Sequence, residues 1–299
     1  MNKISIIGRG FVGSALEQVI SEAGYEVYSY DIKDSIDIQT GYRMAVEHSP
    51  VIYLCLPTPS GEDGDCDTSI VEEACFLIHE ISSDMNKVPL LLIKSTLKVG
   101  TISRIQQSVN PMLICNPEFL TERTAYKDCK NPSSILIGIP AGHSNPFCLF
   151  LSSFHKKIWP MAKLVFTEIE NAELIKQMTN TFFSLKITFA NHMRLLCDSL
   201  NIKYEEFIHS ALLADGRLGE VHWKVPGPDG KFGFGGHCLP KDLKAMIKTF
   251  EQNDVPTSIL NSIEDFNQEI RTKKEEECQQ DLIKETFQLL RKIFFLPRN

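Results

Sequence analysis

The sequence GRGFVG at residues 8–13 decides the fold expected for the first half of the chain. It follows an apolar run, Ile4 to Ile7, and opens a segment with helical spacing near 12–23. In such strand–turn–helix units, the first glycine permits a tight turn and the second lets the backbone approach a pyrophosphate. The third lets the helix pack closely on the strand. The motif therefore predicts a dinucleotide site. The contacts expected from it are Gly8, Gly10, Phe11, Val12 and Gly13.

An acidic residue, Asp31, ends the next expected strand, 18 residues after Gly13. A carboxylate at this position can accept hydrogen bonds from the adenosine ribose and would repel a 2′-phosphate. Lys33 weakens that repulsion and is included among the expected cofactor contacts. The pattern favours NAD over NADP, and its strand–turn–helix context disfavours the alternative of a glycine-rich turn without a ligand.

Short apolar runs alternate with helical patterns through the first half of the chain. The expected strands are Ile4–Ile7, Glu26–Tyr30, Val51–Leu56, Val88–Lys94, Met112–Cys115 and Ile135–Ile139. The expected helices lie near 12–23, 40–48, 68–83 and 101–109. This alternation predicts βαβ units and a parallel, doubly wound α/β sheet of Rossmann-like type, over residues 1–165.

The pattern changes near Glu168. Residues 168–200 contain no Gly or Pro and repeat apolar side chains every three or four positions, which predicts one long helix. Further helices are expected at 203–213, 240–252 and 257–294, with a Gly- and Pro-rich loop at 216–237. We therefore expect an all-helical central domain over 166–270 and an amphipathic helical tail over 271–299.

Composition excludes several classes of protein. The 299 residues are 43% hydrophobic and 23% charged, with a net charge of −7, so nucleic-acid or anionic-membrane binding has no electrostatic support. The nine cysteines show no C-x-x-C spacing, and no His/Cys/Asp/Glu cluster has metal-ligand spacing, so neither disulfides nor a metal is expected. Without a signal-peptide or membrane-span pattern, a cytoplasmic protein is expected.

The segment GFGGHCLPKD at 233–242 carries the strongest chemical signal. Pro240 suits the first turn of a helix, so Cys238 would lie at a helix N-terminus, where the helix dipole favours a thiolate. Asp242, four residues on, would share the same helix face. A thiol beside a nicotinamide suggests covalent oxidation of an aldehyde through a thioester. A buried cysteine that merely caps the helix is the competing interpretation.

Six motifs in order make the chain similar to a known family. They are GRGFVG at 8–13, LCLPTP at 54–59, KSTLKVGT at 94–101, NPEFLTE at 116–122, AELIKQMTN at 172–180 and GFGGHCLPKD at 233–242. With them the sequence resembles the nucleotide-sugar dehydrogenases, which act on UDP-glucose, UDP-N-acetylmannosamine or GDP-mannose, from the N-terminus to about residue 268. The resemblance implies NAD-dependent, four-electron oxidation of a sugar-nucleotide primary alcohol, with UDP-glucose to UDP-glucuronate as the expected case.

The same resemblance assigns catalytic roles. Cys238 matches the nucleophile that forms the thioester. Lys176 and Asn180 match the pair that steadies the substrate hydroxyl and the developing oxyanion, and Asp242 matches the carboxylate that organises the lysine and a water. Glu118 matches the residue that activates water for thioester hydrolysis. Thr96 matches a residue that orders water near the nicotinamide and contacts the cofactor.

Further matches concern binding. Glu122 and Lys241 match cofactor contacts, while Phe119, Leu120 and Gly235, together with Glu118, Lys176 and Asn180, match contacts to the sugar nucleotide. Arg217 resembles an arginine that reaches the sugar of a neighbouring subunit, which implies a homodimer through the long helix.

Three features depart from the family pattern. Family members continue into a second Rossmann-like domain that binds the nucleotide of the substrate. This sequence ends at Asn299, so the UDP-binding domain is expected to be lacking. Arg123 stands where a glycine usually follows, and the loop from Val221 to Lys231 is longer. Two alternatives therefore stay open: a non-catalytic or partner-dependent NAD-binding remnant, and a dehydrogenase of another sugar nucleotide.

Overall fold

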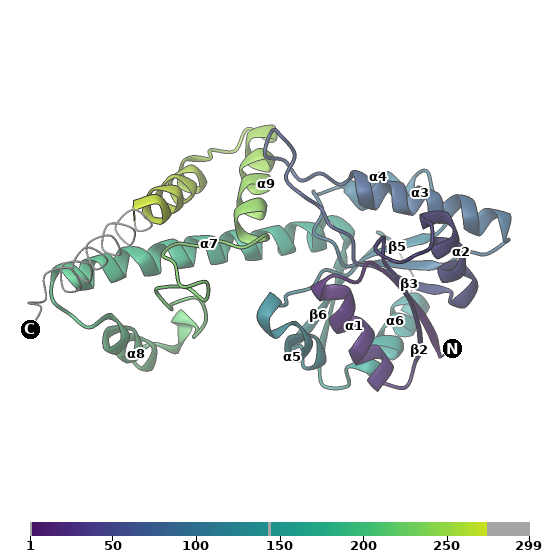
Figure 1. The fold of residues 1–299 in the computed structure, drawn as a ribbon, viewed down its shortest axis with the longest axis horizontal. Helices are drawn as coiled ribbons and strands as arrows, with labels where there is room; N and C mark the ends of the chain where they lie inside the picture. The colour runs from purple at the N-terminus through teal and green to yellow at the C-terminus, as the bar shows by residue number, and fades with distance from the viewer. Residues whose placement is uncertain (1, 143–144, 274–299) are drawn as a thin grey trace, which may run out of the picture. The chain divides into compact units, whose positions relative to one another are not determined.

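The computed structural model describes residues 2–142 and 145–273. The chain divides into two compact units, Met1–Met178 and Thr179–Asn299, and each is described by itself. Figure 1 shows the elements and their order along the chain.

A seven-stranded sheet forms the centre of the first unit, with the strand order β2-β1-β3-β4-β5-β6-β7. Its strands are β1 Lys3–Ile7, β2 Glu26–Tyr30, β3 Val51–Leu54, β4 Leu90–Ile93, β5 Met112–Cys115, β6 Ser134–Ile139 and β7 Lys163–Glu168. Every residue of β3 and β4 is buried, which explains why these strands are continuous apolar runs in the sequence.

The sheet is parallel from β2 to β5, as expected, but β6 pairs antiparallel with β5. The expectation of an entirely parallel sheet is therefore wrong at this pair. The connection between the two strands contains a 3-10 turn at Glu122–Thr124 and a short helix, α5 (Ala125–Lys130), which contacts α1 (Phe11–Glu22) instead of returning the chain to the start of β5. β6 and β7 pair parallel to each other.

Helices cover both faces of the sheet (Figure 1). The helices α2 (Ile38–His48), α3 (Ser69–Asp84) and α4 (Thr101–Gln106) pack into one hydrophobic core. The helices α1, α5 and α6 (Asn145–Ile158) pack into the core on the other face. This is the doubly wound arrangement expected for residues 1–165, although α5, α6 and β7 were not expected from the sequence pattern.

The second unit is helical. The long helix α7 (Ile169–Ser199) begins in the first unit and continues into the second. It is followed by α8 (Tyr204–Ala214), the 3-10 turn η2 (Gly216–Leu218) and α9 (Leu239–Gln252). Residues 258–273 are helical as well. The remainder of the helix expected over 257–294, and nearly all of the tail at 271–299, lie outside the described residues. No helix in the described ranges is both long and apolar enough to cross a membrane.

Candidate active site

The glycine-rich turn between β1 and α1 leaves no room for side chains at two of its glycines. Gly8 has φ +95°, and a Cβ there would lie 2.3 Å from the Cys55 carbonyl oxygen. A Cβ on Gly13 would lie 1.9 Å from the Gly8 carbonyl oxygen. Gly10 is the N-cap of α1, and a Cβ on it would meet open space. The turn therefore offers bare backbone at a helix N-terminus, which fits a pyrophosphate.

The carboxylate of Asp31 lies beside this turn, directly after β2. Its Oδ2 accepts the Arg9 backbone N–H at 2.7 Å, and its Oδ1 accepts the Lys33 N–H at 3.1 Å. The Arg9 N–H, foremost among these contacts, lowers the pKa of Asp31 below its ordinary value. The Arg9 guanidinium pairs with Asp34. Asp31 is therefore held as an anion where a dinucleotide ribose would bind, and these residues fit NAD.

Four residues expected to bind substrate meet in the first unit. Lys176 of α7 lies with its Nζ 3.5 Å from Glu118 Oε1, and the two side chains are only 5% and 10% exposed. Glu118 also accepts the Leu120 backbone N–H. The Lys176 ammonium lies 5.1 Å from the centre of the Phe119 ring. An ammonium and a carboxylate this close can bind one hydroxyl group and transfer its proton.

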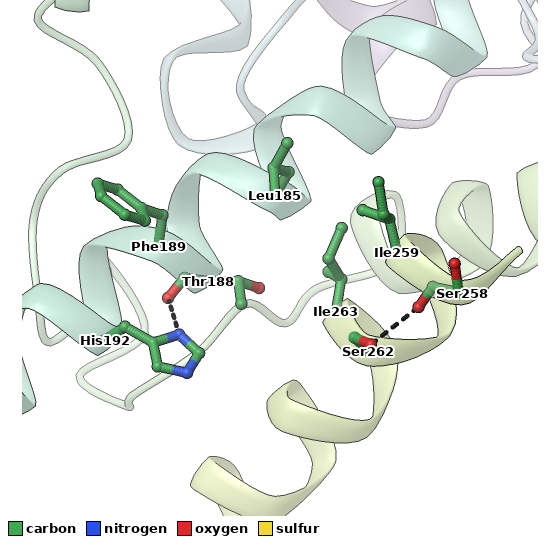
Figure 2. A pocket seen from close by; sticks show the side chains of 8 residues that line it. All are labelled: Leu185, Thr188, Phe189, His192, Ser258, Ile259, Ser262 and Ile263. Carbon is green, nitrogen blue, oxygen red and sulfur yellow. Dashed lines mark hydrogen bonds between the residues drawn. The ribbon is translucent and has the colours of Figure 1, made fainter.

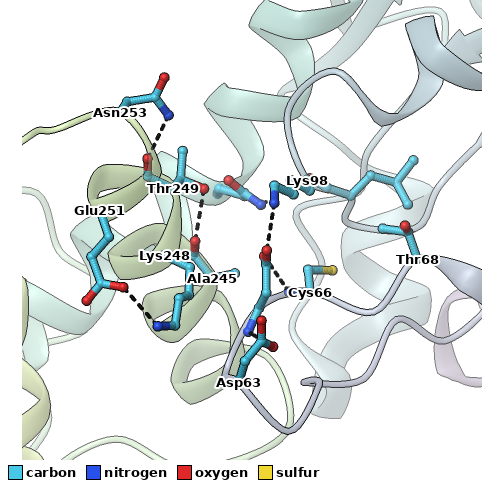
Figure 3. A network of polar contacts seen from close by, with 12 residues as sticks. Asp63, Cys66, Thr68, Lys98, Ala245, Lys248, Thr249, Glu251 and Asn253 are labelled. Atoms are coloured by element: carbon cyan, nitrogen blue, oxygen red, sulfur yellow. Dashed lines mark hydrogen bonds and ion pairs between the residues drawn. The ribbon is translucent and has the colours of Figure 1, made fainter.

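Thr96 lies in the loop from Lys94 to Gly100, which joins β4 to α4. Its carbonyl oxygen accepts the Thr58 hydroxyl at 2.8 Å and the Cys66 thiol at 3.6 Å. Lys98 pairs with Asp65 at 2.6 Å, and Asp65 accepts the Cys66 N–H at 2.8 Å (Figure 3). The backbone at Thr96 is therefore fixed by the segment that follows β3.

Sequence reasoning missed two residues at the ends of buried strands. Lys94, after β4, donates from Nζ to Asn116 Oδ1 at 3.2 Å, and burial lowers its pKa. Asn116, after β5, donates from Nδ2 to the Leu136 carbonyl at 2.8 Å, which holds the start of the segment that carries Glu118. Lys94 is the first residue of the motif KSTLKVGT, and Asn116 is the first residue of NPEFLTE. Their position at the carboxyl ends of parallel strands, where ligands of such sheets bind, was the available signal.

Four expected residues meet in the second unit. Cys238 is the N-cap of α9, and Pro240 lies in its first turn, as expected. The Asp242 side chain, 1% exposed, accepts hydrogen bonds from Asn180 Nδ2 of α7 and, at 2.6 Å, from Lys241 Nζ. The Asp242 N–H bonds the Cys238 carbonyl at 2.9 Å. Asp242 therefore ties the helix turn that bears the thiol to the amide on α7.

The segment before Cys238 is held by two amides that sequence reasoning missed. Asn191 Oδ1 accepts the Gly233 N–H at 2.9 Å. Asn267 Oδ1 accepts the Phe234 N–H at 2.7 Å, and its Nδ2 donates to the Phe234 carbonyl at 3.0 Å. A Cβ on Gly235 would lie 2.9 Å from the Arg271 guanidinium, so a larger side chain does not fit there without a shift. The glycines of this motif allow a close backbone approach.

Two other expected residues lie apart from these groups. Arg217 is exposed in η2, where its guanidinium pairs with Asp215 at 2.5 Å. Glu122 is exposed in the 3-10 turn η1 (Glu122–Thr124). A cavity of about 370 Å³ in the second unit contains none of the expected site residues (Figure 2). Its lining residues are Leu185, Thr188, Phe189, His192, Ser258, Ile259, Ser262 and Ile263.

Comparison with known proteins identifies both parts of the chain. Residues 33–149 match the NAD binding domain of the UDP-glucose/GDP-mannose dehydrogenase family, and residues 170–269 match the central domain of the same family. Together the two matches cover more than two thirds of the chain.

Individual relatives agree with these matches. UDP-glucose 6-dehydrogenase of Rhizobium meliloti is 28% identical over 87% of this chain and 66% of its own length. GDP-mannose 6-dehydrogenase of Pseudomonas aeruginosa is 27% identical over 87% of this chain and 67% of its own length. The solved structure of a UDP-glucose dehydrogenase from Pyrobaculum islandicum superposes with a TM-score of 0.75 at 26% identity, covering 90% of this chain and 68% of that one.

The chain thus spans about two thirds of the length of the relatives it matches. The match to the family's NAD binding domain covers residues 33–149, and the cofactor of this chain is NAD. On the two domain matches and the shared fold, the chain belongs to the UDP-glucose/GDP-mannose dehydrogenase family.

Proposed function

We propose that this protein oxidises the primary alcohol of a nucleotide sugar to a carboxylate, and that the sugar nucleotide is UDP-glucose. One observation carries the proposal: Cys238 begins a helix whose Asp242 is bonded to both Asn180 and Lys241. A cysteine that merely capped a helix would not require a buried carboxylate with two polar partners one turn away.

The reaction proceeds in three chemical stages. The alcohol loses a proton and a hydride to give an aldehyde; the Cys238 thiolate adds to the aldehyde, and loss of a second hydride leaves a thioester on sulfur. Water then cleaves the thioester, which restores the thiol and yields the acid. NAD, when bound at the glycine-rich turn, supplies the hydride acceptor, and two molecules are consumed for each sugar.

The two groups of polar residues have separate tasks in this proposal. Lys176 donates a hydrogen bond to the substrate oxygen and stabilises its negative charge, and Asn180, one turn along α7, assists it. Glu118, 3.5 Å from Lys176, accepts the proton of the attacking water. Asp242 holds Asn180 and Lys241 in position. Thr96, Glu122 and Lys241 contact the cofactor, while Phe119, Leu120 and Gly235 contact the sugar nucleotide.

The choice of UDP-glucose rests on relatives, which include both UDP-glucose and GDP-mannose 6-dehydrogenases. The test is NADH formation by the purified chain with a panel of sugar nucleotides: UDP-glucose, GDP-mannose and UDP-N-acetylmannosamine. We expect the highest kcat/KM with UDP-glucose. A higher value with either other sugar would refute the substrate, and NAD binding without turnover of any sugar would favour the non-catalytic or partner-dependent alternative.

The domain boundaries, the location in the cell and the oligomeric state are also proposals. We propose domain boundaries at 165/166 and 270/271, a cytoplasmic location, and a homodimer through α7, in which Arg217 reaches the neighbouring subunit's sugar. The dimer is supported by exposed apolar side chains along α7, namely Leu174, Met178, Phe182, Leu185 and Phe189. Light scattering would contradict the dimer if it gave the mass of a single chain.

A further inference from the structure

The first turns of α7 carry two fully buried polar side chains that have no role in the proposed mechanism. Glu173 is 1% exposed and Gln177 is 0% exposed. They stand four residues apart, so they lie on one face of the helix. A carboxylate is rarely buried this completely unless specific donors compensate its lost hydration. The partners of these two side chains therefore indicate what they do.

Both side chains bind the backbone of the segment that follows β4. Glu173 Oε2 accepts the Gly100 N–H at 2.6 Å, and Oε1 accepts the Ile102 N–H at 3.0 Å. Gln177 Nε2 donates to the Leu97 carbonyl at 3.1 Å. Gly100 is the left-handed N-cap of α4, with φ 85°. Three backbone groups between residues 97 and 102 are thus held by one face of α7.

These bonds connect two residues of the proposed active site. The held segment carries Thr96, one residue before Leu97, and α7 carries Lys176, one residue before Gln177. The Thr58 hydroxyl holds the Thr96 carbonyl from the other side. Any movement of the loop against α7 would therefore shift Thr96 with respect to Lys176 and its partner Glu118.

We propose that Glu173 is a positioning residue, which with Gln177 fixes the loop from Lys94 to Gly100 on α7 so that Thr96 keeps its place relative to Lys176. The inference rests on the proposed function for its catalytic consequence. Its structural part, the anchoring of the loop, rests only on the hydrogen bonds of the first unit.

A neighbouring pair provides a matched control. Glu170, also on α7, accepts the hydroxyl of Ser103 on α4 at 2.5 Å. This bond joins the same two helices, but it is exposed and does not involve the backbone of the loop. If linking α7 to α4 were all that mattered, Glu170→Gln and Glu173→Gln would have similar effects.

The experiment compares the full-length wild-type chain with Glu173→Gln, Gln177→Leu and Glu170→Gln. Amide hydrogen exchange over residues 94–102, calorimetric NAD affinity, and kcat and KM with UDP-glucose are measured for each. For Glu173→Gln we expect at least tenfold faster exchange at Gly100 and Ile102, with unchanged exchange in β1 and β3. We also expect at least threefold weaker NAD binding and a tenfold lower kcat, with KM for UDP-glucose within threefold. Glu170→Gln should match the wild type in all of these.

Gln177→Leu removes only the Leu97 bond and keeps a buried side chain of similar size. It should lower kcat severalfold with little change in KM, and it decides the proposal if Glu173→Gln does not fold. The inference would be overturned if both variants folded and kept the kcat of the wild type. It would also be overturned if amide exchange at Gly100 and Ile102 in Glu173→Gln were as slow as in the wild type.

If the wild-type chain turned over no sugar nucleotide, the proposed function would be refuted, but the anchoring of the loop would not. The anchoring would then be judged by exchange and NAD affinity, because Thr96 is a proposed cofactor contact. Unchanged NAD affinity in Glu173→Gln would in that case overturn it.

Discussion

Cys238 is the residue on which the proposed chemistry depends most. Replacing it by Ser keeps the size of the side chain but removes the sulfur that would form the thioester. We expect turnover of UDP-glucose to acid to fall by at least ~100-fold while NAD affinity stays within a factor of about two, because the NAD-binding turn lies elsewhere in the chain. Product analysis by mass spectrometry, beside calorimetry with NAD, checks both parts. Undiminished acid formation would remove Cys238 from the mechanism.

We expect Asp31 to determine the preference between the two nicotinamide dinucleotides. Its carboxylate is bonded to the turn that carries Arg9, and its lowered pKa keeps it anionic at neutral pH. We expect the wild type to bind NAD in preference to NADP. Asp31→Ala should reduce the ratio of NAD affinity to NADP affinity by about tenfold. The variant loses both the charge-assisted bond to the adenosine ribose of NAD and the repulsion of the 2′-phosphate of NADP. Equal affinities in the wild type, measured by calorimetry, would contradict this role.

Glu173 should make the stability of the protein depend on pH. Burial raises its pKa from 4.5 to about 7, with Glu170 adding to the rise and the Gly100 and Ile102 N–H groups opposing it. The folded state therefore holds a proton that the unfolded state has released between those pH values, so stability from this group falls as pH rises from about 4.5 to 7.

The measurement is the free energy of unfolding of wild type and Glu173→Gln at pH 5 and pH 8, from denaturant titrations. The wild type should lose roughly 2–3 kcal/mol relative to the variant over this range. Glu170→Gln keeps the buried Glu173 carboxyl and removes only the smallest of the contributions to its pKa, so its stability should still fall between pH 5 and pH 8, by slightly less than that of the wild type. If the free energies of unfolding of the wild type and Glu173→Gln differed by the same amount at pH 5 and at pH 8, Glu173 would not titrate between these pH values.

In the β1–α1 unit, Gly8 and Gly13 are required for packing, whereas we expect Gly10 to be required for NAD binding. A Cβ at position 13 would collide with backbone, whereas a Cβ at position 10 would meet nothing within 4 Å. Gly13→Ala should therefore cost about 1–3 kcal/mol of stability through overpacking. Gly10→Ala should leave stability unchanged but weaken NAD binding, since its methyl group would face the pyrophosphate. Equal stability of the two variants in thermal unfolding would contradict this division.

The helices and strands show how much of the fold could be predicted from the sequence. Strands such as β3 and β4, buried on both faces, are unbroken apolar runs and were recognised, as was α7 from its regular spacing. The region 140–165 was not assigned, because prolines interrupt its pattern three times: Pro140 precedes α6, Pro146 lies in the first turn of α6, and Pro160 stands between α6 and β7. The antiparallel pairing of β6 depends on the path of a short connection, which residue spacing does not report.

Prediction of the site had a similar limit. Residues inside continuous motifs, such as Cys238 and Asp242 on one helix turn, could be paired from their spacing of four. Asn191 and Asn267 bond to residues 42 and 33 positions away, and an isolated asparagine carries no sign of such a partner. Buried amides that satisfy the backbone of a loop become recognisable only once the fold brings them to it.

The two units of the chain carry different parts of one proposed reaction. The first has the glycine-rich turn and the Glu118–Lys176 pair, and the second has the thiol with Asn180, Lys241 and Asp242. The helix α7 belongs to both units and carries Lys176 and Asn180 one turn apart. A four-electron oxidation requires both sets, whereas an NAD-binding remnant requires only the turn.

The stoichiometry of the reaction distinguishes a four-electron oxidation from a simple alcohol oxidation. Limiting UDP-glucose is converted to completion by the purified chain with excess NAD, and the NADH formed is divided by the sugar consumed. We expect a ratio of two, because one hydride leaves the alcohol and a second leaves the thiol adduct at Cys238. A ratio of one, with the aldehyde as the product, would contradict it.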